Sequence, residues 1–157
     1  MSLESVRTHF ENVAPDLEVL VTDESSATVD LAAQAHGVAP GQIAKTLSIQ
    51  LKEKIFLVVT RGDVRLDNKK AKAAFGGKVK MLGLEDVERL TGHPVGGVCP
   101  FGLAEPLPVY CDVSLKDFDI VIPAAGATNA AVKISPERMA EITSAEWVDV
   151  CQPPLSS

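Results

Sequence analysis

The stretch IAKTLSIQL, residues 43–51, places one charged side chain in the apolar row of an otherwise alternating strand. Side chains alternate between the two faces of a strand, so every second residue shares a face. Lys45 falls in the row formed by Ile43, Leu47, Ile49 and Leu51. The pattern leaves two interpretations open. Lys45 either snorkels, burying its stem while its ammonium reaches water, or lies in a pocket where desolvation lowers its pKa.

The loop GGVCPFG, residues 96–102, is the second segment whose residue types could do chemistry. Glycine and proline specify an unusual backbone path, and consecutive N–H groups in such a turn can bind an anion or a carbonyl oxygen. A plain tight loop between a helix and a strand explains the spacing equally simply. Cys99 in this loop is a candidate nucleophile only if His93, six residues earlier, approaches it as a base.

Composition excludes several classes of site. Three cysteines are an odd number and contain no CxxC pair, and the three histidines are scattered, so neither a disulfide framework nor a metal site is predicted. The N-terminal residues lack the pattern of a signal peptide, and no apolar run reaches the length of a membrane span. The sequence therefore predicts a cytoplasmic protein without a membrane segment, cofactor or metal.

Basic residues are concentrated in one segment of an acidic chain. The formal net charge is −6, which argues against broad nucleic-acid binding. Residues 61–80, however, carry seven basic and two acidic residues, a local net charge of +5. Lys69, Lys70 and Lys72 lie on the expected outer face of a helix there. They form either a solvated helix face or a docking site for a polyanion.

Helix and strand patterns surround these segments without a linker, so residues 1–157 are expected to form one domain. Helices are predicted at residues 2–13, 28–36, 68–75, 84–91 and 136–143. Strands are predicted within residues 17–22, 43–51, 55–60, 78–82, 107–112, 118–124 and 130–134. Because several strands follow one another through short loops, the expected fold is α/β, with a mixed, mostly antiparallel sheet surrounded by helices.

The order of the motifs resembles the YbaK/EbsC family. The segments TVDLAAQAHGV, IAKTLSIQL, FLVVTRGDVRLDNKKA, LTGHPVGGVCPFG, VYCDVSL and AGATNAAVKISPERM carry this resemblance from about Thr28 to about Thr143. Its two most specific pieces are the lysine of I-x-K-T-L, Lys45, and the G-x-x-x-P loop from Gly96 to Pro100. The members are freestanding aminoacyl-tRNA deacylases similar to the editing domain inserted in bacterial prolyl-tRNA synthetases.

The resemblance implies a trans-editing hydrolase that removes a small non-cognate amino acid from tRNA, with tRNA-Pro as the expected carrier. It implies Lys45 as the catalytic residue and Lys69, Lys70 and Lys72 as tRNA contacts. The substrate would be bound by Thr46, Gly96, Gly97, Val98, Cys99, Pro100 and Asn129. Aminoacyl-tRNA is the implied partner, with prolyl-tRNA synthetase as a second candidate.

Two rival hypotheses stay open. One is a non-catalytic protein of the same fold that binds tRNA or a synthetase. The other is a cysteine hydrolase that acts through Cys99 on a different ester or thioester.

Overall fold

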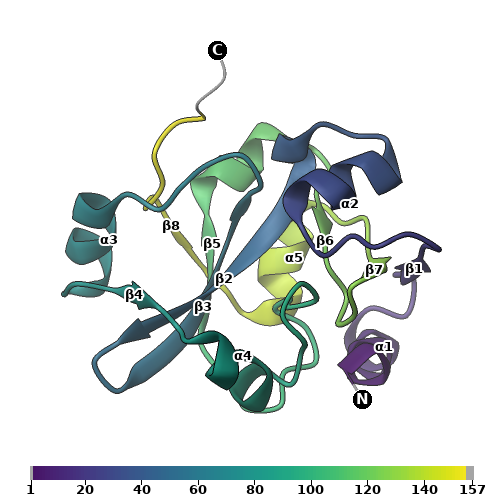
Figure 1. Ribbon diagram of the computed structural model, residues 1–157, viewed down its shortest axis with the longest axis horizontal. Helices are drawn as coiled ribbons and strands as arrows, with labels where there is room; N and C mark the ends of the chain where they lie inside the picture. The colour runs from purple at the N-terminus through teal and green to yellow at the C-terminus, as the bar shows by residue number, and fades with distance from the viewer. Residues whose placement is uncertain (1, 155–157) are drawn as a thin grey trace.

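A six-stranded mixed sheet is the centre of the molecule, and the computed structural model describes residues 2–154 of the chain (Figure 1). The main strand order is β4-β2-β3-β5-β8, and β6 pairs with β2 off this path. These strands are β2 (Ile43–Leu51), β3 (Lys54–Arg61), β4 (Lys80–Met81), β5 (Val109–Asp112), β6 (Ile122–Pro123) and β8 (Glu146–Val148). A separate antiparallel pair joins β1 (Leu20–Val21) to β7 (Ala130–Ala131).

The hairpin of β2 and β3 supplies the longest pairing, an antiparallel register that runs from Ala44 opposite Arg61 to Leu51 opposite Lys54. Lys52 adopts a positive φ of 55° in the tight turn between the strands. The strand β4 is also antiparallel to β2, whereas β5, β6 and β8 join their neighbours in parallel. The expected α/β fold with a mixed sheet surrounded by helices is therefore confirmed.

Helices begin where the sequence offers side-chain caps. The Thr28 hydroxyl accepts a hydrogen bond from the Leu31 N–H, the Asp67 carboxylate from two N–H groups, and the Ser135 hydroxyl from the Arg138 N–H. The helices of the described chain are α1 (Ser2–Val13), α2 (Val29–His36), α3 (Asn68–Phe75), α4 (Leu84–Thr91) and α5 (Pro136–Thr143), with short 3₁₀ turns at Pro40–Gln42 and Val113–Asp117.

The two faces of the central hairpin pack into separate apolar clusters, because alternate side chains point to opposite faces. Leu57 and Val59 belong to the larger cluster, which includes residues of α1 and α5. Phe56 and Val58 belong to the other cluster, which includes residues of α3. Most of the chain's fully buried side chains lie in these two clusters, so the hairpin is held rigidly from both sides.

Candidate active site

The outer edge of β2 is only partly paired. β6 pairs with Ile43 and Ala44 at one end, and β4 pairs with Ile49 and Gln50 at the other. The Ser48 carbonyl accepts a hydrogen bond of 2.9 Å from the Leu82 N–H and therefore faces this edge. Thr46, two residues earlier, faces the same edge by the strand period, so its backbone N–H and C=O point into the gap between β6 and β4.

A cavity of about 470 Å³ lies at this gap, a volume within the usual range of ligand sites. Its walls are mostly aliphatic, with hydroxyl groups from Ser26, Thr28, Thr46 and Ser48. Lys45 is the only charged residue among the described residues that line it. Any chemistry inside therefore depends on this ammonium, on these hydroxyl groups, on backbone groups, or on groups that the ligand brings.

Lys45 lies between Ile43 and Leu47 in the apolar row on β2. Leu47 packs against the cluster that includes α3, whereas Ile43 and Lys45 line the cavity. Its Nζ donates a hydrogen bond of 2.5 Å to the Val64 carbonyl, in the loop that follows β3. An ammonium has three N–H donors, and no further acceptor contacts it among the described residues. Burial lowers the pKa of Lys45, and the nearby Asp63 carboxylate partly opposes that shift.

An ion pair fixes the loop that holds Lys45. The Arg61 guanidinium donates to both oxygens of Asp63, at 2.5 Å and 2.8 Å, and to Asp117 at 2.8 Å. The hydrogen bonds from Arg61 hold the pKa of the Asp63 carboxyl below its usual range. Because Val64 follows Asp63 directly, this bidentate pair also positions the carbonyl that Lys45 contacts.

The glycine loop reaches the cavity through Gly96. Gly96 has φ of +90°, and a Cβ there would lie 2.9 Å from the Ala27 Cβ, so this position requires glycine for both conformation and space. Gly97, unlike Gly96, does not have a positive φ. It requires glycine because a Cβ would lie 2.9 Å from the Ala127 backbone.

The backbone of Gly97 is already used within the protein. Its N–H donates to the Pro94 carbonyl at 2.8 Å, and its carbonyl accepts from the Gly126 N–H at 3.1 Å. The first bond closes a local turn, and the second ties the glycine loop to the segment before β7. Gly97 therefore supports the loop, whereas Gly96 and Val98 line the cavity.

Cys99 belongs to the glycine loop, but it is buried and is absent from the cavity wall. Its Sγ lies 3.6 Å from Nε2 of His93, so the loop does bring these two residues together. However, His93 Nε2 also lies 2.7 Å from the Phe101 carbonyl. A carbonyl can only accept, so Nε2 carries the proton and is not a base for the thiol. Burial raises the pKa of Cys99 to about 12, which keeps the thiol neutral near pH 7.

Of the remaining expected substrate contacts, Thr46, Pro100 and Asn129, only Thr46 lines the cavity. Thr46 lines the cavity, and its buried hydroxyl makes no hydrogen bond with the described residues. Pro100 is buried and lies outside the cavity wall. The Asn129 side chain also lies outside the wall; it donates to the Thr22 carbonyl at 3.0 Å and joins β7 to the segment after β1.

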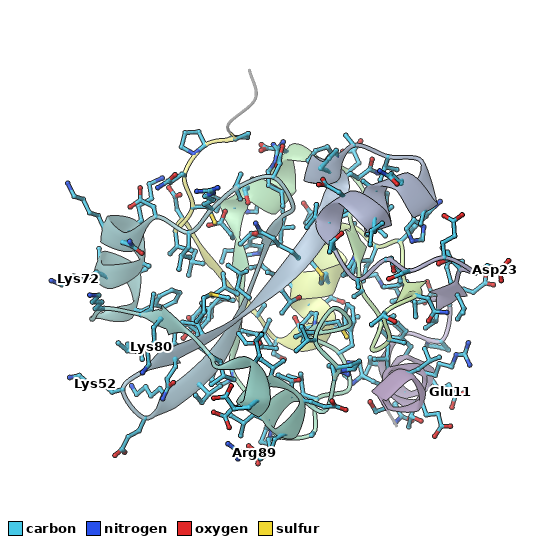
Figure 2. All side chains as sticks on the ribbon, in the orientation of Figure 1. Glu11, Asp23, Lys52, Lys72, Lys80 and Arg89 are labelled. Carbon is cyan, nitrogen blue, oxygen red and sulfur yellow. The ribbon has the colours of Figure 1, made fainter. Side chains whose placement is uncertain are left out.

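The three expected tRNA contacts lie on the exposed surface of α3. Lys70 pairs with Asp149 at 3.1 Å and also donates to the Cys151 carbonyl at 3.2 Å. No hydrogen bond or ion pair joins a Lys69 or Lys72 side chain to the described residues. Figure 2 shows Lys72 on the same side of the molecule as Lys52 and Lys80, opposite Glu11 and Asp23.

Several residues of the cavity wall carried no signal in the sequence. The segment before α2 contributes Ser26 and Ala27, and β4 and α4 contribute Met81, Leu84 and Val87. These positions are ordinary aliphatic or small residues, and only their place beside the cavity distinguishes them. Met81 and Leu84 are 56% and 70% exposed, which is unusual for large apolar side chains.

Two negative findings apply to the described part of the chain. No group of three or more histidine, cysteine, aspartate or glutamate side chains is arranged to hold a metal ion there. None of its helices combines the length and apolar composition that crossing a membrane requires.

The fold and the cavity together define a small α/β protein with one lysine at an apolar site. Over residues 23–142 the chain matches the aminoacyl-tRNA editing domain, and it belongs to that family. It is 46% identical to the uncharacterised protein YwhH of Bacillus subtilis over 154 residues, covering 97% of this chain and 98% of that one.

Two further relatives are named for an editing activity. The chain is 30% identical over 129 residues to EbsC of Enterococcus faecalis, named as a proposed Cys-tRNA(Pro)/Cys-tRNA(Cys) deacylase, covering 81% of this chain and 79% of that one. A crystal structure described as a candidate trans-editing enzyme for prolyl tRNA synthetase superposes with a TM-score of 0.89 at 33% identity, covering 96% of this chain and 97% of that one. The expected similarity to the YbaK/EbsC deacylases is thus confirmed.

Proposed function

We propose that this protein hydrolyses the ester of mischarged aminoacyl-tRNA in trans, with a small non-cognate amino acid on tRNA-Pro as the substrate. The observation that carries the proposal is the single ammonium of Lys45 at an apolar cavity beside the unpaired edge of β2. Membership of the editing family and the names of the relatives support the same reaction. A synthetase separates amino acids that differ by one methylene by only about 1–3 kcal/mol, so a second hydrolytic site is useful.

The cavity suits an ester that is already activated. Water attacks the carbonyl carbon, the bond to the ribose oxygen breaks, and a proton passes to that oxygen, which leaves free amino acid and intact tRNA. Negative charge develops on the carbonyl oxygen during the attack. Lys45 stabilises that charge, and its field is stronger at an apolar site than in water.

The open edge of β2 positions the substrate. The Thr46 N–H can donate to an oxygen of the ester, and the Thr46 C=O can accept from the α-ammonium group of the amino acid. Gly96 and Val98 bound the same space from the glycine loop. In this arrangement Gly97, Cys99 and Pro100 shape the loop, and Asn129 fixes the neighbouring strand pair without touching the substrate.

Removal of the water proton has two candidate bases. No carboxylate or imidazole lines the cavity in the described residues, so the base is either a ribose hydroxyl of the substrate or Lys45 in its neutral form. Lowering of the Lys45 pKa by burial favours neither role by itself. The dependence of the deacylation rate on pH distinguishes the two bases.

The function is tested by incubating the purified protein with tRNA-Pro that carries radiolabelled alanine, cysteine or proline. The proposal expects free alanine or cysteine and rechargeable tRNA, with prolyl-tRNA-Pro turned over much more slowly. Alanyl-tRNA-Ala serves as a control for the choice of tRNA. A non-catalytic binding protein would protect the ester from spontaneous hydrolysis instead, and that result would overturn the proposal.

A further inference from the structure

Three large apolar side chains surround the mouth of the cavity and are exposed to solvent. They are Met81 on β4, Leu84 at the start of α4, and Val95 just before the glycine loop, at 56%, 70% and 51% exposure. Met81 and Leu84 lie three residues apart, where β4 leads into α4, and Val95 comes from a second segment beyond α4, so the fold brings the two segments together at one cavity. Exposed apolar side chains gathered at one site indicate a binding surface.

From this arrangement we propose that Met81, Leu84 and Val95 form a platform for the base of the terminal adenosine of the tRNA. The inference rests on the proposed function and extends it from the ester to the nucleoside. In the substrate, the ester and the base are attached to the same ribose. If the ester carbonyl lies at Lys45 and Thr46 inside the cavity, the adenine base must lie within one ribose length of that carbonyl, at the mouth of the cavity.

The size of the site supports a nucleoside at the mouth. A cavity of about 470 Å³ is much larger than an alanyl or cysteinyl group requires. The purine is flat and largely apolar on its faces, and aliphatic and thioether groups pack against such a face. By contrast, three side chains around an opening cannot supply the roughly 800 Å² per partner that a stable protein interface buries.

Charge around the platform matches the rest of the tRNA terminus. Lys80 precedes Met81 directly and is exposed, and Lys78 is exposed in the same segment. Figure 2 shows Lys80 beside Lys52 on one side of the molecule. With the base on Met81 and Leu84, the preceding phosphate can extend toward these ammonium groups, which position the strand without reading its sequence.

The test compares two small esters, 3′-O-alanyl-adenosine and the alanyl ester of 1-O-methylribose, which has no base. The parent protein is expected to favour the adenosine ester by at least about tenfold in kcat/KM. Met81→Ser and Leu84→Ser should each reduce that ratio about 3- to 10-fold, since each removes apolar contact area with the base. Val113→Ser is the matched control, because Val113 is an exposed valine outside the cavity wall, and its ratio should equal that of the parent.

The outcomes separate this inference from the proposed function. A parent protein that hydrolyses both esters equally well overturns the platform and leaves the deacylase intact. Equal losses on both esters in Leu84→Ser also overturn it, because the residue would then serve the cavity rather than the base.

If neither ester is hydrolysed, binding of adenosine 5′-monophosphate followed by NMR chemical shifts still decides the platform, and hydrolysis of mischarged tRNA-Pro decides the proposed function separately. Weaker binding in Leu84→Ser than in Val113→Ser supports the platform. Equal binding in the two variants, or no binding to the parent, overturns it.

Discussion

Replacing Gly96 with alanine tests whether the glycine loop must keep its position beside Lys45. The new Cβ would face two separate obstacles, a φ of +90° and the Ala27 Cβ at 2.9 Å. Gly76 offers a matched control, because it has φ of +82° and nothing within 4 Å of an added Cβ. Gly76 ends α3 and lies outside the cavity wall.

The conformational cost is shared by the two variants, and the steric cost is not. An L-residue in the left-handed region costs about 1–2 kcal/mol, and overpacking of a tight contact adds about 1–3 kcal/mol. Gly96→Ala should therefore lose about 2–5 kcal/mol of unfolding free energy and Gly76→Ala about 1–2 kcal/mol. Because a misplacement of about 1 Å can cost about 10²-fold in rate, a displaced loop should also slow deacylation by about 10- to 100-fold.

The assay measures urea unfolding and initial deacylation rates for both variants at a temperature where both remain folded. Adding Ala27→Gly to Gly96→Ala removes the Cβ contact and should restore part of the lost rate, which distinguishes a displaced loop from general instability. The reasoning is refuted if Gly96→Ala deacylates as fast as Gly76→Ala. It is also refuted if Ala27→Gly restores stability without any gain in rate.

Further predictions concern the charged and nucleophilic groups. Because burial lowers the pKa of Lys45, its side chain binds fewer protons in the folded protein than in the unfolded chain between that lowered pKa and the ordinary 10.5. The contribution of Lys45 to stability should therefore rise with pH in this window, so the unfolding free energy of Lys45→Met, measured in urea, should fall relative to that of the parent as pH rises. As pH rises through the pKa of Lys45, the deacylation rate, corrected for spontaneous hydrolysis of the ester, should fall if the ammonium stabilises the oxyanion. A rate that increases instead identifies Lys45 as the base. Cys99→Ala should keep deacylation within about twofold of the parent, since the buried thiol is neutral with a pKa of about 12, and a loss comparable to that of a lysine variant would revive the cysteine hydrolase. Changing Lys69, Lys70 and Lys72 on α3 to glutamine should raise KM for aminoacyl-tRNA and weaken the salt dependence of that KM, with much less effect on KM for an aminoacyl-adenosine. Similar effects on the two substrates would exclude a phosphate-binding role for these lysines.

The sequence predicted the elements whose local signals agree with one another. The strand at residues 43–51, the helices at residues 68–75 and 136–143, and the exposed α3 lysines all follow from period and capping chemistry. The strand at Glu146–Val148 was missed, because it is short and pairs in parallel with β5, which no local pattern specifies. Several expected strands proved shorter than their apolar runs, since tertiary packing decides where pairing ends.

Some residues of the candidate site could likewise be predicted from the sequence, and others could not. Lys45 stood out because a charge interrupted an apolar row, and Gly96 because glycine accumulates in its loop. Loop residues next to one another in sequence, however, point in different directions, so the pattern could not separate Gly96 and Val98 from the buried Cys99. The wall formed by β4 and α4 depends on long-range packing and had no sequence signal.

The central claim is that Lys45 drives ester hydrolysis, and the most direct measurement is the deacylation rate of Lys45→Met on mischarged tRNA-Pro. Methionine keeps most of the apolar stem and removes the charge together with the hydrogen bond to the Val64 carbonyl, and Lys54→Met on the exposed end of β3 is the control for loss of a lysine charge. Loss of one preorganised oxyanion interaction predicts a rate reduced by about 10²–10³-fold, or roughly 3–4 kcal/mol, in Lys45→Met, with the parental rate in Lys54→Met. Lys45→Arg should recover little activity, because the guanidinium is larger and presents its charge differently. Parental deacylation by a folded Lys45→Met protein would contradict the proposed mechanism.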